Sequence, residues 1–144
     1  MLGTRILQFN CGLANYKTTR PILDAADPNT HQVLAIQEQA YNRYTATTHC
    51  PWGYSLASNS DPAAKVCFMV SKKIPAHTWS LQSLGQYVGT LQMQMNDVEM
   101  TITNVYNSRG NGPRIQTWNT IQRALCVAKG KILLLGDFNA HHPS

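Results

Sequence analysis

Short apolar runs separated by turn-forming residues make up most of the chain, and most of these runs are too short to be helices. The runs at 5–9 and 32–36 predict two strands, which end at Asn10 and Glu38. The middle of the chain has four further runs bounded by Pro, Gly, Asn and Asp. These predict antiparallel strands at 53–59, 65–71, 78–84 and 87–95.

A β-hairpin is predicted around residues 96–97. Apolar and polar positions alternate up to Met95, and they alternate again from Val98 to the end of the returning strand at Tyr106. The Asn96-Asp97 pair between them has the chemistry of a tight turn, so the two strands are expected to pair.

Two stretches follow helical spacing instead. Residues 18–26 predict a helix that Thr18 or Thr19 caps, with Pro21 in its first turn. Asp27-Pro28-Asn29 then supplies turn residues that end it.

The second helix is predicted over 113–129, with Pro113 near its first turn and Gly130 at its end. Its helical face consists of Ile115, Trp118, Ile121, Gln122 and Leu125. The apolar run that follows, 131–135, predicts a buried strand that Gly136 breaks. Strands with helices before and after them predict an α/β fold in which packed sheets are covered by helices.

Composition sets limits on this picture. The chain has 144 residues, of which 43% are hydrophobic, so it can form the core of one domain or of part of one. The net charge of +5 arises from few acids, and it is as compatible with a polyanionic partner as with none. No apolar stretch approaches the roughly 20 residues of a membrane span, and no signal peptide is evident, so an intracellular protein is expected.

The cysteines do not form metal-binding or disulfide patterns. None of the four belongs to a CxxC pair, and three lie within apolar patterns. We therefore expect buried free thiols in a reducing compartment.

Chemistry-bearing side chains occur where the predicted strands end. These residues are Asn10, Glu38, Tyr106, Asp137 and Asn139. Strands that pair in one core bring their ends together, so the five side chains are expected to line one cleft. Oxygen ligands of this kind suit Mg²⁺ or Mn²⁺. With two acids, one can hold the metal while the other orients or deprotonates an attacking water.

Each residue also has a structural interpretation. Asn10 lies beside Gly12 and can be a turn residue, Glu38 can cap a loop, and Tyr106 can be a half-buried strand aromatic. Asp137 and Asn139 can form an Asx turn. The adjacent His141 and His142 are more typical of packing and hydrogen bonding than of metal ligation. A shared functional site is nevertheless favoured over these separate interpretations, because the five candidates other than the histidines all lie at predicted strand ends.

Four segments together resemble, in order, the motifs of the endonuclease/exonuclease/phosphatase superfamily. They are ILQFNCGL (6–13), LAIQE (34–38), TNVYN (103–107) and LGDFNAHHP (135–143). The last segment is particularly similar to the apurinic-type endonuclease domain of non-LTR, LINE-like retrotransposons. The resemblance implies a four-layer α/β/β/α sandwich and a Mg²⁺- or Mn²⁺-dependent hydrolase that nicks DNA.

The resemblance also assigns roles to residues. It makes Glu38 the main metal ligand with Asn10 beside it, and it makes Asp137 the residue that activates water. Tyr106 would contact the scissile phosphate, and Asn139 would bind a phosphate oxygen. In such retrotransposons the nick primes reverse transcription, which implies a nuclear protein with a reverse transcriptase domain encoded downstream.

The chain departs from the family pattern in two ways. The loop after Tyr106 lacks the Pro-Asn pattern of many relatives, and Arg109 is a candidate for a phosphate contact there, with a solvated loop arginine as the alternative. Relatives also continue with further strands, a second aspartate and a Ser-Asp-His-type motif. His31, His49 and His77 do not replace that histidine, because they are expected in loops or at strand starts.

Residues 1–144 are therefore expected to be the N-terminal portion of a single domain, with one sheet short of strands. Two alternatives to a DNA-nicking enzyme stay open. One is a catalytically inactive relic or nucleic-acid-binding module, and the other is a small-substrate phosphatase of the same superfamily.

Overall fold

The computed structural model describes residues 3–12, 15–59, 61–108 and 114–139. These residues form ten principal elements and a short 3₁₀ turn, η1, at Ala76–Thr78. In chain order the elements are β1 Ile6–Asn10, α1 Tyr16–Asp24, β2 Val33–Gln37, β3 Tyr54–Ala57, β4 Val66–Ser71, β5 Trp79–Ser83, β6 Val88–Met95, β7 Val98–Tyr106, α2 Arg114–Val127 and β8 Lys131–Asp137.

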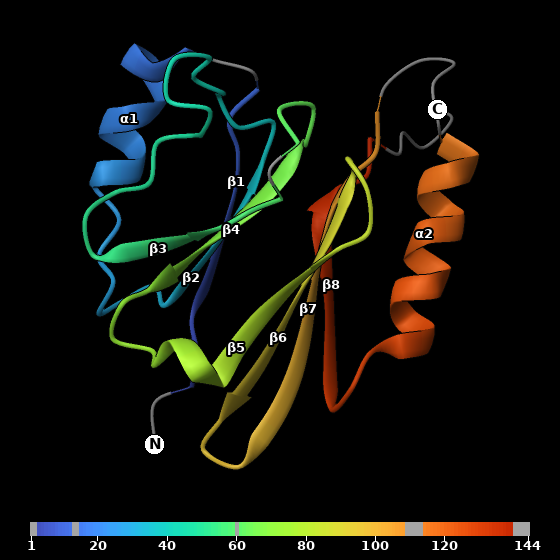
Figure 1. Ribbon diagram of the computed structural model, residues 1–144. Helices are drawn as coiled ribbons and strands as arrows, with labels where there is room; N and C mark the ends of the chain where they lie inside the picture. The colour runs from blue at the N-terminus through green and yellow to red at the C-terminus, as the bar shows by residue number, and fades with distance from the viewer. Residues whose placement is uncertain (1–2, 13–14, 60, 109–113, 140–144) are drawn as a thin grey trace, which may run out of the picture.

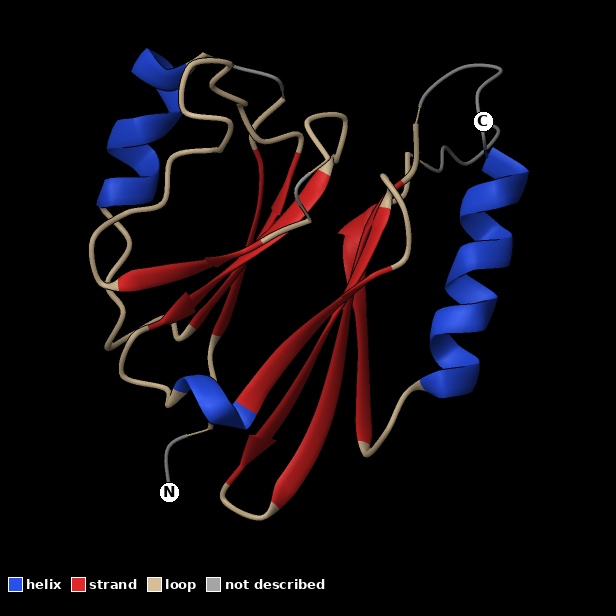
Figure 2. Cartoon of the chain, viewed as in Figure 1, coloured by secondary structure: helices blue, strands red, loops and turns tan. Residues whose placement is uncertain are grey.

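Two four-stranded mixed sheets pack face to face (Figure 1). The strand order is β1-β2-β4-β3 in the first sheet and β5-β6-β7-β8 in the second. Helix α1 covers the outer face of the first sheet and α2 the outer face of the second, as the colours of Figure 2 make clear. The predicted four-layer α/β/β/α arrangement is confirmed.

The central strands of the first sheet are buried on both faces, which explains their continuous apolar runs. Val33 and Phe68 face the second sheet and pack in one cluster with residues such as Ile102 of β7. The alternate residues, such as Leu34, pack under α1 against Leu23. A strand covered on both sides needs apolar residues at every position rather than at alternate ones.

Each sheet contains one parallel pair, and this pairing sets the location of the site. β1 runs parallel to β2, with Asn10 in register with Gln37. β7 runs parallel to β8, with Tyr106 in register with Asp137. Parallel strands end at the same edge of a sheet, so the carboxyl ends of all four strands lie at one end of the sandwich, the upper end in Figure 1.

Helix α1 begins earlier than predicted. Its N-cap is Asn15, whose side-chain oxygen accepts a hydrogen bond from the Thr18 amide at 3.2 Å, so neither Thr18 nor Thr19 is the cap. Pro21 lies inside the helix rather than in its first turn. A proline at this position removes one hydrogen bond of the helix, because it has no backbone N–H. At the start of the helix, the Asn15 side chain provides an acceptor for one amide that would otherwise have no partner in the helix.

Strand β8 differs from the prediction in two respects. Gly136 does not break the strand, which continues to Asp137 with Gly136 at φ 147°. The strand is also not buried, since Ile132 is 51% exposed. β8 lies at the edge of the second sheet, so one side has no neighbouring strand among the described residues. An apolar run alone does not distinguish an edge strand from a central one.

Helix α2 turns a different face to the sheet than its apolar spacing suggested. Thr117, Ile121 and Ala124 are buried, whereas Trp118 is 49% exposed and Leu125 38% exposed. Trp118 instead stacks on Phe138, with ring centroids 6.4 Å apart. The predicted start of the helix, Pro113 with the side chain of Ile115, lies outside the described residues.

All four cysteines are free, as predicted, but they are not all buried. Cys11 and Cys67 are buried, Cys50 is half-buried, and Cys126 is exposed on α2. No helix of the described residues is long and apolar enough to cross a membrane.

Candidate active site

Asn10 and Asp137 join the two sheets at their common carboxyl end. The Asn10 side-chain nitrogen Nδ2 donates to Asp137 Oδ2 at 2.7 Å, and its Oδ1 accepts from the Gly12 amide at 2.7 Å. The turn interpretation and the site interpretation of Asn10 therefore both apply. One oxygen shapes the loop after β1, and the nitrogen reaches across to the carboxylate.

The segment 137–139 is held as an Asx turn. The Asn139 amide donates to Asp137 Oδ1 at 3.1 Å, and Asn139 adopts a left-handed backbone at φ 44°. Both oxygens of Asp137 thus accept hydrogen bonds, which fixes the orientation of the carboxylate. The Asx turn was the structural alternative to a functional role for these two residues. In the folded chain this turn helps to orient the carboxylate of the candidate site.

Asn107, which the sequence did not single out as functional, connects β7 to this turn. Its backbone amide donates to the Asp137 carbonyl at 2.7 Å and its Nδ2 donates to the Phe138 carbonyl at 2.8 Å. Its own carbonyl accepts from the side chain of Asn139. A proline here, as the family pattern would place, could not donate through its nitrogen. The signal available in the sequence was an amide directly after a strand end.

Glu38 follows β2 in a strained conformation. Its φ of 51° is unusual for a residue with a Cβ, and such strain costs on the order of 1–3 kcal/mol. The Glu38 amide donates to the Lys65 carbonyl at 2.8 Å, which anchors the bend. Burial raises the pKa of the neighbouring Cys11 thiol to about 11, and the negative charge of Glu38 adds to that rise.

Tyr106 ends β7 next to Asp137 in register on β8. Its ring stacks on that of Tyr87, with centroids 6.3 Å apart and planes inclined by 24°. The structure thus places it as a half-buried aromatic at the site's edge. Its predicted contact with phosphate stays a prediction.

Beneath the site, a set of side-chain amides connects the sheets through the core. Gln37 Nε2 donates to Asn104 Oδ1 at 2.6 Å, and Asn104 Nδ2 donates to two main-chain carbonyls of the first sheet, those of Ile36 and Cys67, at 3.0 Å each. Gln8 Nε2 donates to the Gly136 carbonyl at 2.9 Å. Gln37 and Asn104 are fully buried, so these bonds fix the spacing of the residues that precede Glu38 and Asp137.

The donor set fits a hard divalent cation. Glu38, Asp137 and the amide oxygen of Asn10 offer oxygen atoms only, which is the preference of Mg²⁺ and Mn²⁺. Among the described residues no three His, Cys, Asp or Glu side chains gather into a metal-binding group. With at most two carboxylates, the remaining ligands would be water and substrate phosphate, as is common for Mg²⁺.

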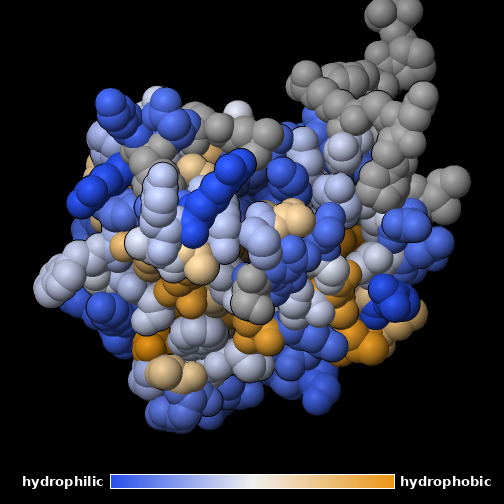
Figure 3. Space-filling model, turned by 45° about the horizontal axis from the view of Figure 1, so that its top comes forward, coloured by the Kyte–Doolittle hydropathy of each residue, from blue (hydrophilic) through white to orange (hydrophobic). Residues whose placement is uncertain are grey.

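The surface around the site is polar. Figure 3 turns this end of the molecule forward and shows mostly hydrophilic side chains over it.

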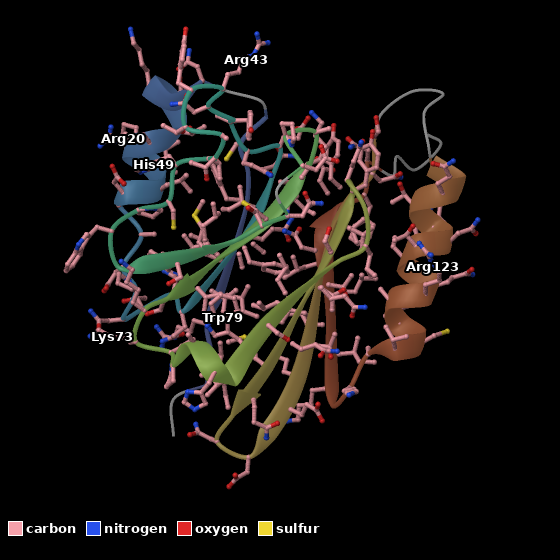
Figure 4. The ribbon with its side chains drawn as sticks, in the orientation of Figure 1. Arg20, Arg43, His49, Lys73, Trp79 and Arg123 are labelled. Atoms are coloured by element: carbon pink, nitrogen blue, oxygen red, sulfur yellow. The ribbon has the colours of Figure 1, made fainter. Side chains whose placement is uncertain are left out.

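Figure 4 shows His49 beside α1, where its Nε2 lies 2.6 Å from Asp24 Oδ1 and fastens the loop after β2 to the helix. The candidates Arg109, His141 and His142 lie outside the described residues.

Three solved structures match the chain with a TM-score of 0.67 each. They are the endonuclease domain of TRAS1, a telomere-specific non-LTR retrotransposon, a humanized D. rerio TDP2, and the AP endonuclease LMAP from Leishmania major. The chain shares its fold with these three structures. The sequence identities to them are 18%, 12% and 13%, so the likeness is one of fold.

The matches cover 96%, 96% and 95% of this chain but only 61%, 63% and 55% of those chains. The chain therefore spans less than two thirds of the length of the solved structures it matches. No protein-family model matches the chain, and no curated protein sequence does either.

Proposed function

We propose that this chain carries the metal-binding and water-activating part of a Mg²⁺-dependent phosphodiesterase that nicks DNA. The observation that carries the proposal is the 2.7 Å bond between Asn10 and Asp137, which brings the first and last of the four motifs together. Glu38 and Tyr106 lie at the same end of the sandwich, and the superfamily fold contains nucleases among its members.

In this proposal Asp137 acts as the base. Its carboxylate is oriented by Asn10 and by the Asn139 amide, and it accepts a proton from water as the water oxygen bonds to phosphorus. The phosphorus–oxygen bond on the opposite side breaks, and the leaving oxygen takes a proton from solvent. Glu38 and the Asn10 oxygen would hold the cation, which when bound offsets the charge that develops on phosphate. Tyr106 and Asn139 would position the phosphate.

Nicking of supercoiled plasmid tests this function. A form extended to the length of the structural matches should convert plasmid to the open circle in Mg²⁺ and not in EDTA, whereas residues 1–144 alone should have little activity. Glu38→Gln and Asp137→Asn should each lower the rate by about 100-fold or more, because each removes a carboxylate from the reaction. Equal nicking by wild type and Glu38→Gln would refute the proposal.

A second candidate is a nucleic-acid-binding module without turnover. The net charge of +5, which suits a polyanionic partner, is the observation that favours it. Salt-dependent DNA binding without nicking would support this candidate. With the first candidate, the DNA-nicking phosphodiesterase, we also propose a retroelement origin, a reverse transcriptase encoded downstream and a nuclear location.

A further inference from the structure

An apolar pocket lies at the end of the sandwich opposite the candidate site. It has a volume of about 170 Å³ and lies between residues 3–4, which precede β1, and the hairpin that joins β6 to β7. Figure 1 shows this hairpin at the lower end of the molecule, whereas the carboxyl ends of β1 and β8 lie at the upper end. The pocket is therefore separate from the proposed phosphate site.

Unequal strand lengths explain why there is a hollow here. β6 has eight residues and β7 has nine, whereas β1 has five. The hairpin therefore extends beyond the first sheet, and residues 3–4 rather than a strand of that sheet lie over its inner face (Figure 1). The Thr4 hydroxyl donates to the sulfur of Met95 at 3.0 Å, which fixes this segment at one side of the pocket.

Three methionines form the apolar wall of the pocket. Met93 and Met100 are directly opposite each other in register, and Met95 lies two residues further along the same strand, opposite Val98. Alternate residues of a strand face the same way, so the three side chains share the face that is turned toward the first sheet. Thioethers are flexible and polarizable, and they make favourable contacts with aromatic rings. The wall therefore suits an aromatic ligand.

Lys131 supplies a positive charge at the pocket. It is in register with Met100 across the parallel pair of β7 and β8, so the two side chains lie on the same face. Of the described residues that line the pocket, only Lys131 is charged. Its ammonium group forms no ion pair within the described part of the chain. An anionic group at the mouth of the pocket would therefore meet an ammonium group without a competing carboxylate.

The volume limits the ligand to about one ring. An apolar protein cavity of roughly 150 Å³ is known to bind benzene. The pocket has a similar volume, about 170 Å³, and it is well below the roughly 300 Å³ at which drug-sized sites begin. A compact ring with one acidic group therefore fits, whereas most carbons of a long acyl chain would stay in water.

We propose that this pocket binds a small aromatic carboxylate. Its ring would lie against Met93, Met95 and Met100, and its carboxylate would pair with Lys131. The ring provides most of the affinity through burial, because an exposed ion pair contributes little. This inference is independent of the proposed function, since the pocket lies at the other end of the molecule.

NMR of labelled methionine methyl groups, with benzoate as the probe, tests the inference. The signals of Met93, Met95 and Met100 should shift in a saturable way with one common dissociation constant, because a bound ring changes the field at nearby methyl groups. Met69 is fully buried in the separate cluster under α1, and its signal should not move. Acetate, which has the charge but no ring, should shift none of them at the same ionic strength.

Three variants test the roles of charge and space. Lys131→Gln should weaken benzoate binding about threefold, as expected for an exposed ion pair, and should leave binding of uncharged benzyl alcohol unchanged. Lys129→Gln removes the same charge from a residue outside the lining and should alter neither affinity. Val98→Phe, at a position that is 37% exposed, should fill the pocket and abolish binding of both probes, while an unchanged Met69 signal shows that the fold is kept.

The outcomes that contradict the inference are distinct. Absence of a saturable shift at the three methionines, or an equal shift at Met69, would show that benzoate does not bind in this pocket. Equal loss of benzoate and benzyl alcohol binding in Lys131→Gln, or no loss of either, would refute the pairing of the carboxylate with Lys131. Each of these results would leave the proposed function untouched.

Discussion

The side chain of Asn10 is hydrogen-bonded to Asp137 at 2.7 Å, although the two residues are 127 positions apart in the chain. One residue belongs to the first sheet and the other to the second, so the bond exists only when the sheets are packed. The chemistry of the site and the stability of the sandwich are therefore coupled through this pair.

Asn10→Ala should lower the free energy of unfolding by about 1–2 kcal/mol, because a hydrogen bond to a carboxylate is lost in a half-buried place. Urea denaturation followed by circular dichroism would measure it. Asn119→Ala, on the exposed side of α2, is the matched control and should change stability by less than about 0.5 kcal/mol. Equal effects of the two variants would mean that the cross-sheet bond adds nothing.

Gly136→Ala should destabilise the fold by about 3 kcal/mol or more. Gly136 has φ 147°, and a Cβ there would overlap the backbone carbonyl of Val105 on β7. Thermal unfolding would detect the loss. Gly3→Ala meets no atom within 4 Å and should be nearly neutral. A stable Gly136→Ala protein would show that β8 can shift away from β7.

The open edge of β8 should promote self-association. Ile132 is 51% exposed on a strand with no neighbour on one side among the described residues, and such edges pair readily with other chains. Sedimentation velocity should show dimers or larger species that Ile132→Lys reduces. Ile22→Lys, at an equally exposed site on α1, should leave the association unchanged. A monomeric wild type at high concentration would contradict this.

Thiol reactivity should single out Cys126. It is exposed, whereas burial raises the pKa of Cys50 to about 11 and also raises that of the fully buried Cys67. Because the thiolate is the reactive form, native protein at pH 8 should have one rapidly alkylated cysteine and three slow ones. Mass spectrometry of peptides after brief iodoacetamide treatment would identify it. Cys126→Ser should remove the fast phase.

The Asp24–His49 contact should contribute to acid sensitivity. The hydrogen bond from His49 lowers the pKa of Asp24 in the folded state, with smaller contributions from the charges of His49 and Arg20. A lowered folded pKa gives stability that is present above the ordinary Asp pKa of about 3.9 and is lost as pH falls through the folded value. Asp24→Asn lacks this contribution at every pH. Between about pH 5 and about pH 3, its melting temperature should therefore fall less than that of wild type. Asp97→Asn, in the hairpin turn, should behave like wild type.

Local patterns were sufficient to predict most elements of this fold. Alternation of apolar and polar residues on both sides of Asn96-Asp97 predicts the hairpin, and both turn residues do adopt positive φ angles of 48° and 63°. Continuous apolar runs predict the inner strand β2. These patterns report on neighbours in the sequence and on burial, which is why they also placed Asn10, Glu38, Tyr106 and Asp137 correctly at strand ends.

Other features depended on which surfaces meet in space. The apolar run of β8 reads like that of a central strand, and only the sheet order shows that it is an edge. Gln37 and Asn104 read as polar interruptions, yet they are buried because each finds its partner in the opposite sheet. The linear pattern alone was enough to locate the elements and the polar residues at their ends. Only the tertiary structure shows that Asn10 meets Asp137, because that bond requires the two sheets to be packed together. Likewise, Asn107 holds the turn only because β7 and β8, which are separated in the chain by α2, pair in one sheet.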